Sequence, residues 1–146
     1  MSEEGISPWP VETRCTCGGV GLRLLVKPLS MFLCTCLDCQ KSSGTGHAPL
    51  ALFLKDNVSI EGETSQYSAT ATSGSKVTRH FCPTCDTPVF GETERQPMIR
   101  LVPAGIFEQS EWFEPGSVIF HRSHNHWDSL PQDLPTFSTY KENQNA

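Results

Sequence analysis

The sequence lacks the long apolar run, the basic clusters and the export signal that mark several large classes of protein. No apolar stretch approaches the roughly 20 residues of a membrane-spanning helix, so we expect no membrane insertion. Lysine and arginine number 11 against 16 acidic residues and form no run, which argues against nucleic-acid binding. Residues 1–10 contain Glu3 and Glu4 but no apolar core, so they are no signal peptide and we expect a cytoplasmic protein.

Helical periodicity is also missing beyond a turn or two, which predicts a mainly β fold. The 11 prolines and 11 glycines indicate short elements and many turns. Short apolar or alternating runs predict strands at 20–26, 31–33, 50–54, 57–61, 75–81, 89–90, 98–102 and 117–120. An exposed strand and turn are expected within 63–74, and a single helical turn within 108–113.

Cysteine, by contrast, is abundant. The seven cysteines are odd in number, fall in close clusters and follow no export signal, which argues against a disulfide framework and for metal binding. The tail histidines His121, His124 and His126 could also bind a metal, although such residues more often are solvated or bonded to backbone.

Three cysteines lie within six residues, at Cys34, Cys36 and Cys39. Residues two apart on an extended backbone point to the same side, so Cys34 and Cys36 can face a common point, to which a tight turn would return Cys39. Three thiolates without an obvious fourth ligand suggest zinc with one position open to water or substrate. The alternative is a structural zinc site whose fourth ligand comes from elsewhere, and the triplet alone does not separate the two.

The remaining cysteines form two pairs, Cys15 with Cys17 and Cys82 with Cys85. The spacing of the second pair is a strong zinc signal, and Asp86 follows where such a metal-binding turn often needs a left-handed residue. Cys82 and Cys85 could join either the first pair or the triplet, and spacing alone does not choose. We favour a closed site made of both pairs. This division leaves the triplet with an open coordination position, and every cysteine is then a ligand of one of the two sites.

Three segments of the chain carry a combined pattern: Cys-x-Cys-Gly-Gly-Val at 15–20, Cys-x-Cys-x-x-Cys-Gln-Lys at 34–41 and Thr-Arg-His-Phe-Cys-Pro-Thr-Cys at 78–85. Taken together, they resemble the glutathione-dependent formaldehyde-activating enzyme family, shared with centromere protein V. The resemblance implies a β-tent fold of short antiparallel strands stapled by zinc. It divides the chain into a loose leader at 1–13, the zinc-binding domain at 14–138 and a tail at 139–146.

The resemblance also implies two zinc ions, one structural and one catalytic. Their ligands would be Cys15, Cys17, Cys82 and Cys85 for the structural ion, and Cys34, Cys36 and Cys39 for the catalytic ion. Three positions depart from the family pattern: Thr35 replaces a histidine, Asp86 a glycine and His124 a lysine. Thr35 and Asp86 stand at positions that supply no zinc ligand, so these two changes should leave both metal sites intact. His124 replaces a fixed positive charge near the expected mouth of the pocket, so this change could alter which substrate is bound.

The leading functional hypothesis is a carbon–sulfur lyase or synthase that joins glutathione, its co-substrate, to a small aldehyde such as formaldehyde. Zinc would activate the thiol or polarise the carbonyl. Candidates for binding the glutathione carboxylates are Lys41, Arg79 and Arg100. Candidates for relaying a proton are Ser42, Ser43 and His47.

Two alternatives change the function but keep the metal sites. The same open zinc could serve a lyase or isomerase acting on another glutathione adduct, because function belongs to the site rather than to the scaffold. The chain could also be a non-enzymatic, zinc-stabilised interaction module like centromere protein V. We rank that last, since the cytoskeletal role goes with a long basic extension and this chain begins with an acidic segment.

Overall fold

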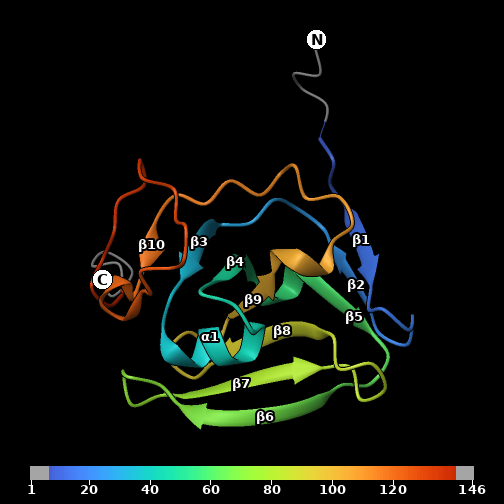
Figure 1. Cartoon of the computed structure of the whole chain (residues 1–146). Helices are drawn as coiled ribbons and strands as arrows, with labels where there is room; N and C mark the ends of the chain where they lie inside the picture. The colour runs from blue at the N-terminus through green and yellow to red at the C-terminus, as the bar shows by residue number, and fades with distance from the viewer. Residues whose placement is uncertain (1–6, 141–146) are drawn as a thin grey trace.

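The computed structural model describes residues 7–140, which fold into two β-sheets with one short α-helix (Figure 1). The strands are β1 (Val11–Arg14), β2 (Gly21–Leu24), β3 (Ser30–Cys34), β4 (Ala48–Leu54), β5 (Val58–Glu61), β6 (Ser65–Thr70), β7 (Lys76–Phe81), β8 (Pro88–Thr93), β9 (Ile99–Pro103) and β10 (Val118–Ile119). The helices are α1 (Leu37–Ser43) and the 3-10 turns η1 (Lys55–Asn57), η2 (Ala104–Ile106) and η3 (His121–Ser123). The predicted mainly β fold of short antiparallel strands is confirmed.

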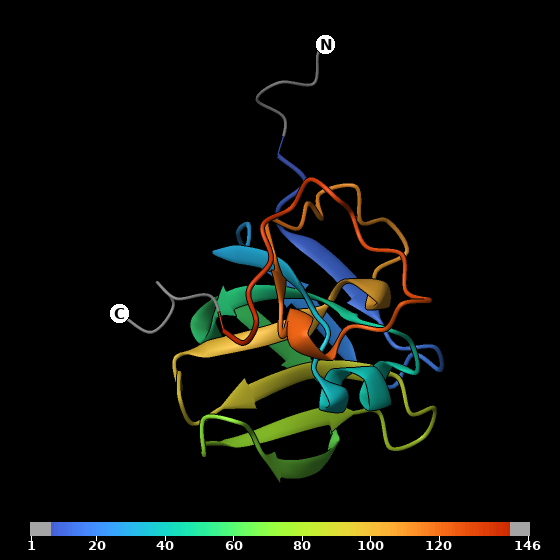
Figure 2. The same cartoon turned by 60° about the vertical axis from the view of Figure 1, so that its left-hand side comes forward.

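The smaller sheet has the strand order β1-β2-β5, and the larger has the order β10-β3-β4-β9-β8-β7-β6. Neighbouring strands are antiparallel except β10, which runs parallel to β3 and pairs Ile119 with Cys34. The smaller sheet and β10 lie at opposite sides of the molecule, and α1 crosses in front of the larger sheet between them (Figures 1 and 2). No helix within residues 7–140 has the length and apolar character needed to cross a membrane.

Two hydrophobic clusters fill the interior, because successive side chains of a strand point to opposite faces of its sheet. On β4, Phe53 belongs to the first cluster and its neighbour Leu52 to the second. The first cluster also contains Leu24 of β2 and Val58 of β5, so it joins the two sheets. Each cluster includes cysteines from one group only: Cys15 and Cys82 in the first, Cys34 and Cys39 in the second.

The N-terminal boundary differs from the prediction, since part of the expected leader is folded. Val11 to Thr13 belong to β1 and pair with β2 in the register Val11 with Leu24. Trp9 packs against Phe53 and Trp112, with ring centroids 6.2 and 5.2 Å apart. Pairing with β1 covers an edge of β2 that would otherwise expose unpaired backbone groups. Residues 1–6 of the expected leader lie outside the described part of the chain.

The helical turn expected within 108–113 is wrong. This segment has only a tight turn, in which the Phe113 N–H donates to the Ser110 carbonyl, and a 3-10 turn forms earlier at η2. The Phe107 and Trp112 rings contact each other at 5.1 Å. Residues five apart on an α-helix lie about 140° apart around its axis, so a helix here would separate these two rings.

The C-terminal segment, assigned in part to a tail, packs on the domain as far as it is described. The Phe120 N–H donates to the Thr139 carbonyl at 2.9 Å, and the Tyr140 ring meets the Phe120 ring edge-on at 4.8 Å. Residues 139 and 140 therefore continue the domain. The remainder of the expected tail, 141–146, lies outside the described residues.

Thr35 offers a test of the β3–β10 connection. Its side chain is fully buried, and its hydroxyl lies 3.0 Å from the Ile119 carbonyl oxygen and 2.6 Å from that of Phe120. Thr35→Val keeps the shape but leaves these carbonyls without that donor, so we expect a loss of about 1–3 kcal/mol in the free energy of unfolding, measured with urea. Thr35→Ser retains the hydroxyl and should lose less; equal stability of the valine variant and the parent would contradict this role.

Candidate functional site

The three cysteines of the middle cluster meet where β3 passes into α1. Cys34 ends β3, Cys36 is the extended N-cap residue of α1 at φ −65° and ψ 159°, and Cys39 is buried in the first helical turn. The Cys36 sulfur accepts a hydrogen bond from the Cys39 N–H at 3.3 Å, as an N-cap side chain does. The three Sγ atoms lie within 4.8 Å of one another. The sequence-based expectation that they face a common point is confirmed.

The other four cysteines converge in a second cluster, also with all Sγ atoms within 4.8 Å of one another. The Cys15 and Cys17 sulfurs are 3.7 Å apart, and those of Cys17 and Cys82 are 3.6 Å apart. A tetrahedral zinc ion with Zn–S bonds of about 2.3 Å holds its sulfurs about 3.8 Å apart. The four thiols therefore fit a closed zinc site that joins the end of β1 to the end of β7.

Backbone geometry around the four-cysteine cluster also suits metal ligation. The Val20 N–H donates to the Cys15 sulfur at 3.2 Å, and the Thr84 N–H to the Cys82 sulfur at 3.4 Å. Such hydrogen bonds favour thiolates and fix the orientation of ligands. Asp86 has φ 66°, the left-handed conformation that the sequence predicted for the residue after the second pair.

The division of the thiols is thus four and three, as favoured from the sequence. Within residues 7–140 no third group of converging metal-ligating side chains occurs, and no histidine or carboxylate joins the three-cysteine group. The rings of His121 and His124 stack at 4.0 Å, but with His126 they form no such group. The three-cysteine cluster therefore suits a zinc ion that keeps one position for a ligand from outside the chain.

The thiols of the middle cluster interact strongly with one another. Hydrogen bonds from Cys34 and Cys39, with smaller contributions from the Cys39 N–H and the Arg79 guanidinium, lower the pKa of Cys36. Hydrogen bonds with Cys36 and Cys39, together with burial, raise the pKa of Cys34. A bound divalent cation would let all three thiols ionise.

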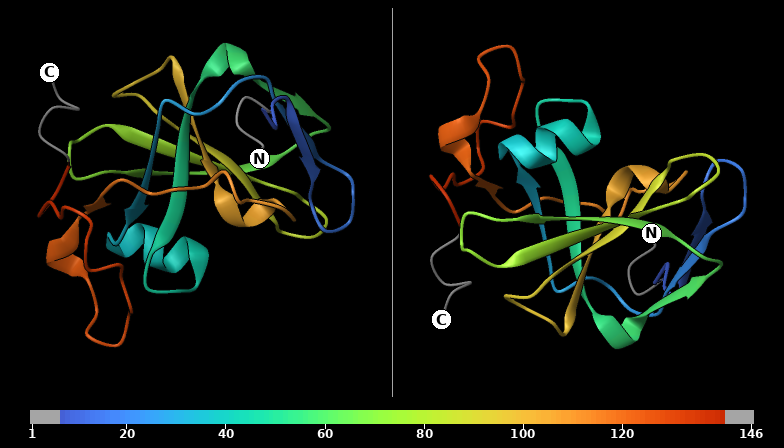
Figure 3. Two further views of the ribbon diagram at one scale, coloured as in Figure 1. Left: turned by 90° about the horizontal axis from the view of Figure 1, so that it is seen from above. Right: turned by 90° about the horizontal axis from the view of Figure 1, so that it is seen from below.

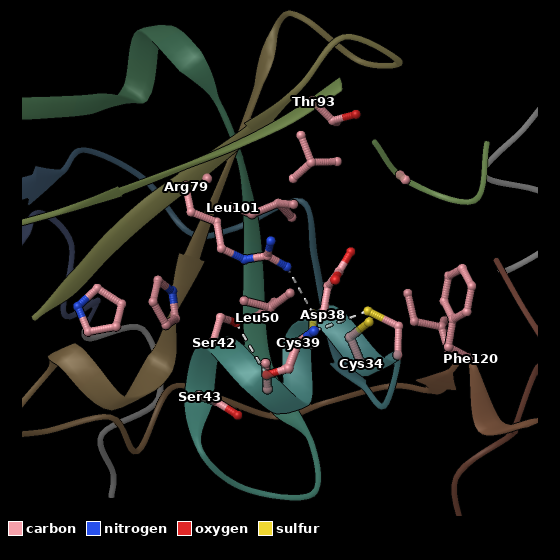
Figure 4. A pocket seen from close by; sticks show the side chains of 18 of the residues that line it. Cys34, Asp38, Cys39, Ser42, Ser43, Leu50, Arg79, Thr93, Leu101 and Phe120 are labelled. Atoms are coloured by element: carbon pink, nitrogen blue, oxygen red, sulfur yellow. Dashed lines mark hydrogen bonds between the residues drawn. The ribbon is translucent and has the colours of Figure 1, made fainter. Parts of the chain in front are cut away.

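A cavity of about 680 Å³ opens beside the middle cluster. Cys34, Cys36 and Cys39 all line it, whereas none of the four-cysteine cluster does. Figure 4 shows α1 at its base, with Leu50 and Leu101 of β4 and β9 on one side and Phe120 on the other. The volume is within the usual range for small-molecule sites. The three-cysteine cluster is therefore accessible to a small molecule in the cavity, whereas the four-cysteine cluster does not line it.

Arg79 holds its guanidinium against a sulfur of the middle cluster. Its side chain extends from β7 toward α1 (Figure 4), and Nη2 lies 3.8 Å from the Cys39 sulfur. The cavity is also lined by the cations Arg95 and Arg122 and the carboxylates Asp38 and Asp86. The predicted glutathione-binding residue Arg79 is thus inside the cavity and against the thiols.

The other predicted contacts are distributed differently. Ser42 and Ser43 line the cavity, but each hydroxyl bonds to a carbonyl of its own helix, that of Cys39 or Gln40. The other three predicted residues, Lys41, His47 and Arg100, do not line the cavity. Lys41 is exposed, and His47 Nδ1 lies 2.8 Å from the Asp128 carboxylate. Arg100 donates to the Val58 carbonyl at 3.1 Å. The proposed roles of Lys41 and His47 stay predictions.

Gln40 fixes α1 to the C-terminal segment. Its Nε2 donates to the carbonyls of Thr35 at 2.8 Å and Ser123 at 3.0 Å, and its Oε1 accepts from Asn125 at 2.9 Å. Both views in Figure 3 place η3 next to α1. This clamp holds the helix that carries Cys36 and Cys39, and Arg122 and Ser123 of η3 reach the cavity from the same side.

The lining residues that escaped the sequence analysis include Arg95, Arg122 and Tyr140. Each stands alone in the sequence, outside the cysteine motifs, so no local pattern marks it. Arg122 follows directly after β10 and its turn, and only the parallel pairing of β10 with β3 brings it beside the cluster. His124, where the family carries a lysine, is exposed and does not line the cavity.

Comparison with known proteins agrees with the site. The model of the glutathione-dependent formaldehyde-activating enzyme family matches residues 10–123. The chain belongs to this family. Among solved structures, it resembles a Rhodobacter sphaeroides protein at 17% identity and a TM-score of 0.55, over 87% of this chain and 99% of that one. That likeness supports the fold alone, and no curated protein matches the sequence significantly.

The middle cluster can be tested by its metal content. We expect the purified parent to carry a zinc ion in each of its two cysteine clusters. Cys36→Ser removes one ligand from a set of three that lies at the edge of a cavity, so zinc should fall toward one ion per chain while the far-ultraviolet circular dichroism stays unchanged. Unchanged zinc content in this variant would contradict the assignment.

The four-cysteine cluster should behave differently. Cys82 is 1% exposed and links the end of β7 to the first hydrophobic cluster. A structural zinc site contributes its binding free energy to folding, so Cys82→Ser should leave the domain unfolded or insoluble under conditions in which Cys36→Ser is folded. A folded Cys82→Ser protein with one remaining zinc ion would show that this cluster is dispensable.

Proposed function

We propose that the protein joins glutathione to a small aldehyde such as formaldehyde, as a zinc-dependent carbon–sulfur lyase working in the direction of synthesis. The observation that carries the proposal is the three-cysteine cluster that lines a cavity without a fourth protein ligand in residues 7–140. Membership of the family supports the choice of co-substrate.

The reaction adds the thiol across the aldehyde carbonyl. A sulfur–carbon bond forms, the carbonyl π bond breaks, and the thiol proton ends on the new hydroxyl oxygen. Zinc held by Cys34, Cys36 and Cys39 would supply either a lowered thiol pKa or Lewis-acid polarisation of the carbonyl.

The protein's own residues bind and orient glutathione. This tripeptide carries two carboxylates and one ammonium group at neutral pH. Arg79, Arg95 and Arg122 provide cations around the cavity, and Asp38 and Asp86 provide anions. Arginine binds carboxylates through paired, charge-assisted hydrogen bonds, so these side chains suit both ends of the tripeptide. We assign Arg79 to orienting the tripeptide near the cluster, because its guanidinium already lies against Cys39.

The state of the thiols supports a cytoplasmic setting for this reaction. All seven cysteines are unpaired, and free metal-binding thiols persist in reducing compartments. Glutathione in its reduced form is the thiol co-substrate there. We therefore place the protein in the cytoplasm.

The proposal is tested by exchange spectroscopy with ¹³C-formaldehyde and glutathione. The adduct forms without a catalyst, so the informative quantity is the exchange rate between free formaldehyde and the S-hydroxymethyl adduct. Zinc-loaded protein should accelerate this exchange, and Cys36→Ser should return it to the uncatalysed rate. An uncatalysed rate in the presence of fully zinc-loaded parent protein would overturn the proposal.

Arg79→Gln tests how glutathione is held. Losing a charge-assisted hydrogen bond costs about 1.5–3 kcal/mol, so the KM for glutathione should rise at least ~10-fold while zinc content stays the same. Arg79→Lys should recover part of the loss. The matched control is Arg23→Gln, since Arg23 is exposed on the smaller sheet and its guanidinium bonds to the exposed Glu12, far from the cavity lining. A fall in zinc content without a change in KM would assign Arg79 a structural role instead.

A further inference from the structure

Apolar side chains form one wall of the cavity beside the middle cluster. Cys34 and Cys39 belong to the same buried cluster as Phe32, Ile119 and Phe120. The half-buried side chains that pack against this cluster and also line the cavity are Leu50, Leu101 and Tyr140. Figure 4 shows the labelled Leu50, Leu101 and Phe120 side chains around the thiols. Apolar surface therefore continues from the reacting position into the cavity.

The charged residues of the cavity, among them Arg79 and Asp38, are distinct from this wall. A polar ligand group that lay against the Leu50, Leu101 and Phe120 side chains would lose hydrogen bonds to water and gain none from these side chains, which is unfavourable. The polar parts of glutathione therefore belong with the charged residues, and the apolar wall suits an apolar group of the ligand.

Formaldehyde leaves this wall unused. It has no apolar group that could contact the Leu50 and Leu101 side chains, and the backbone of glutathione is polar throughout. The apolar lining beside the thiols therefore fits an electrophile with an apolar substituent of its own.

One part of the wall is held in an unusual backbone conformation. Phe120 has φ 58°, in the left-handed region that aromatic residues rarely adopt. Its ring contacts that of Tyr140, which lies beneath the Arg95 guanidinium at 3.9 Å. Tyr140 is C-terminal to the segment matched by the family model, 10–123. The apolar wall thus includes an aromatic residue with a strained backbone, a feature that clusters at ligand-binding sites.

We infer that the electrophile is an aldehyde with an apolar alkyl or aryl substituent of several carbons, whose substituent packs against Leu50, Leu101, Phe120 and Tyr140. This inference rests on the proposed function of the same cavity. The glutathione sulfur bonds to the aldehyde carbon, the carbonyl oxygen takes the thiol proton as a hydroxyl, and the substituent remains in the apolar wall. No further reactant is needed.

The experiment compares the binding of S-hexylglutathione and S-methylglutathione to the zinc-loaded protein by calorimetry. These stable thioethers resemble adducts of a long and a short aldehyde, and their binding is measured without turnover. Each fully buried methylene contributes up to ~4-fold in affinity, so we expect S-hexylglutathione to bind at least ~30-fold more tightly. The exchange rates of formaldehyde and hexanal adducts, measured beside it, should show the same preference for the longer aldehyde.

The outcomes separate this inference from the proposed function. Equal affinities for the two thioethers, with accelerated formaldehyde exchange, would overturn the inference and leave the proposed function standing. No binding of either thioether and no accelerated exchange would overturn both. Tighter binding of S-hexylglutathione without accelerated exchange would support the apolar subsite and contradict the proposed reaction.

A matched pair of variants locates the subsite. Leu101→Gln introduces a polar group of similar size into the wall and should reduce the affinity for S-hexylglutathione at least ~5-fold more than that for S-methylglutathione. Met98→Gln is the control, because Met98 is 60% exposed, precedes the same strand and does not line the cavity. It should leave both affinities unchanged. Equal effects of Leu101→Gln on the two ligands would place the substituent elsewhere.

Discussion

The convergence of seven thiols on two points is the constraint on which the rest of this structure depends. The four-cysteine cluster joins the end of β1 to the end of β7 inside the core shared by the two sheets. A zinc ion bound there would therefore link segments that are far apart in the chain and contribute its binding free energy to folding.

The second cluster uses the same chemistry for a different purpose. Its ligands span only the passage from β3 into the first turn of α1, so they close no large loop. Their positions are fixed instead by the surroundings: Gln40 ties the helix to η3, and Thr35 ties the end of β3 to the residues of β10. With the neighbouring backbone held in this way, a cation there can exchange an outside ligand without loss of the fold. That property is what a catalytic site requires.

Much of this arrangement was predictable from the sequence, because cysteine spacing and strand alternation are local signals. The spacing of Cys34, Cys36 and Cys39 and the need for a left-handed residue at Asp86 both correspond to backbone conformations that the structure shows. The cavity was not predictable. Arg122 and Tyr140 reach it through the pairing of β10 with β3 and the packing of the C-terminal segment on Phe120, which are contacts between residues far apart in the chain. The interaction of Trp112 with Phe107 likewise overrode the local expectation of a helical turn.

Zinc K-edge X-ray absorption tests the unequal use of the two clusters most directly. Seven sulfurs shared between two ions, four on one and three on the other, give (4 + 3)/2, an average of 3.5 sulfurs per zinc with a light-atom ligand making up the difference. Saturation with glutathione should raise the average toward four sulfurs as its thiol takes the remaining position. A shell of 3.5 sulfurs that glutathione leaves unchanged would instead assign zinc to polarising the carbonyl. A first shell of four sulfurs per zinc before glutathione is added would contradict an open catalytic site.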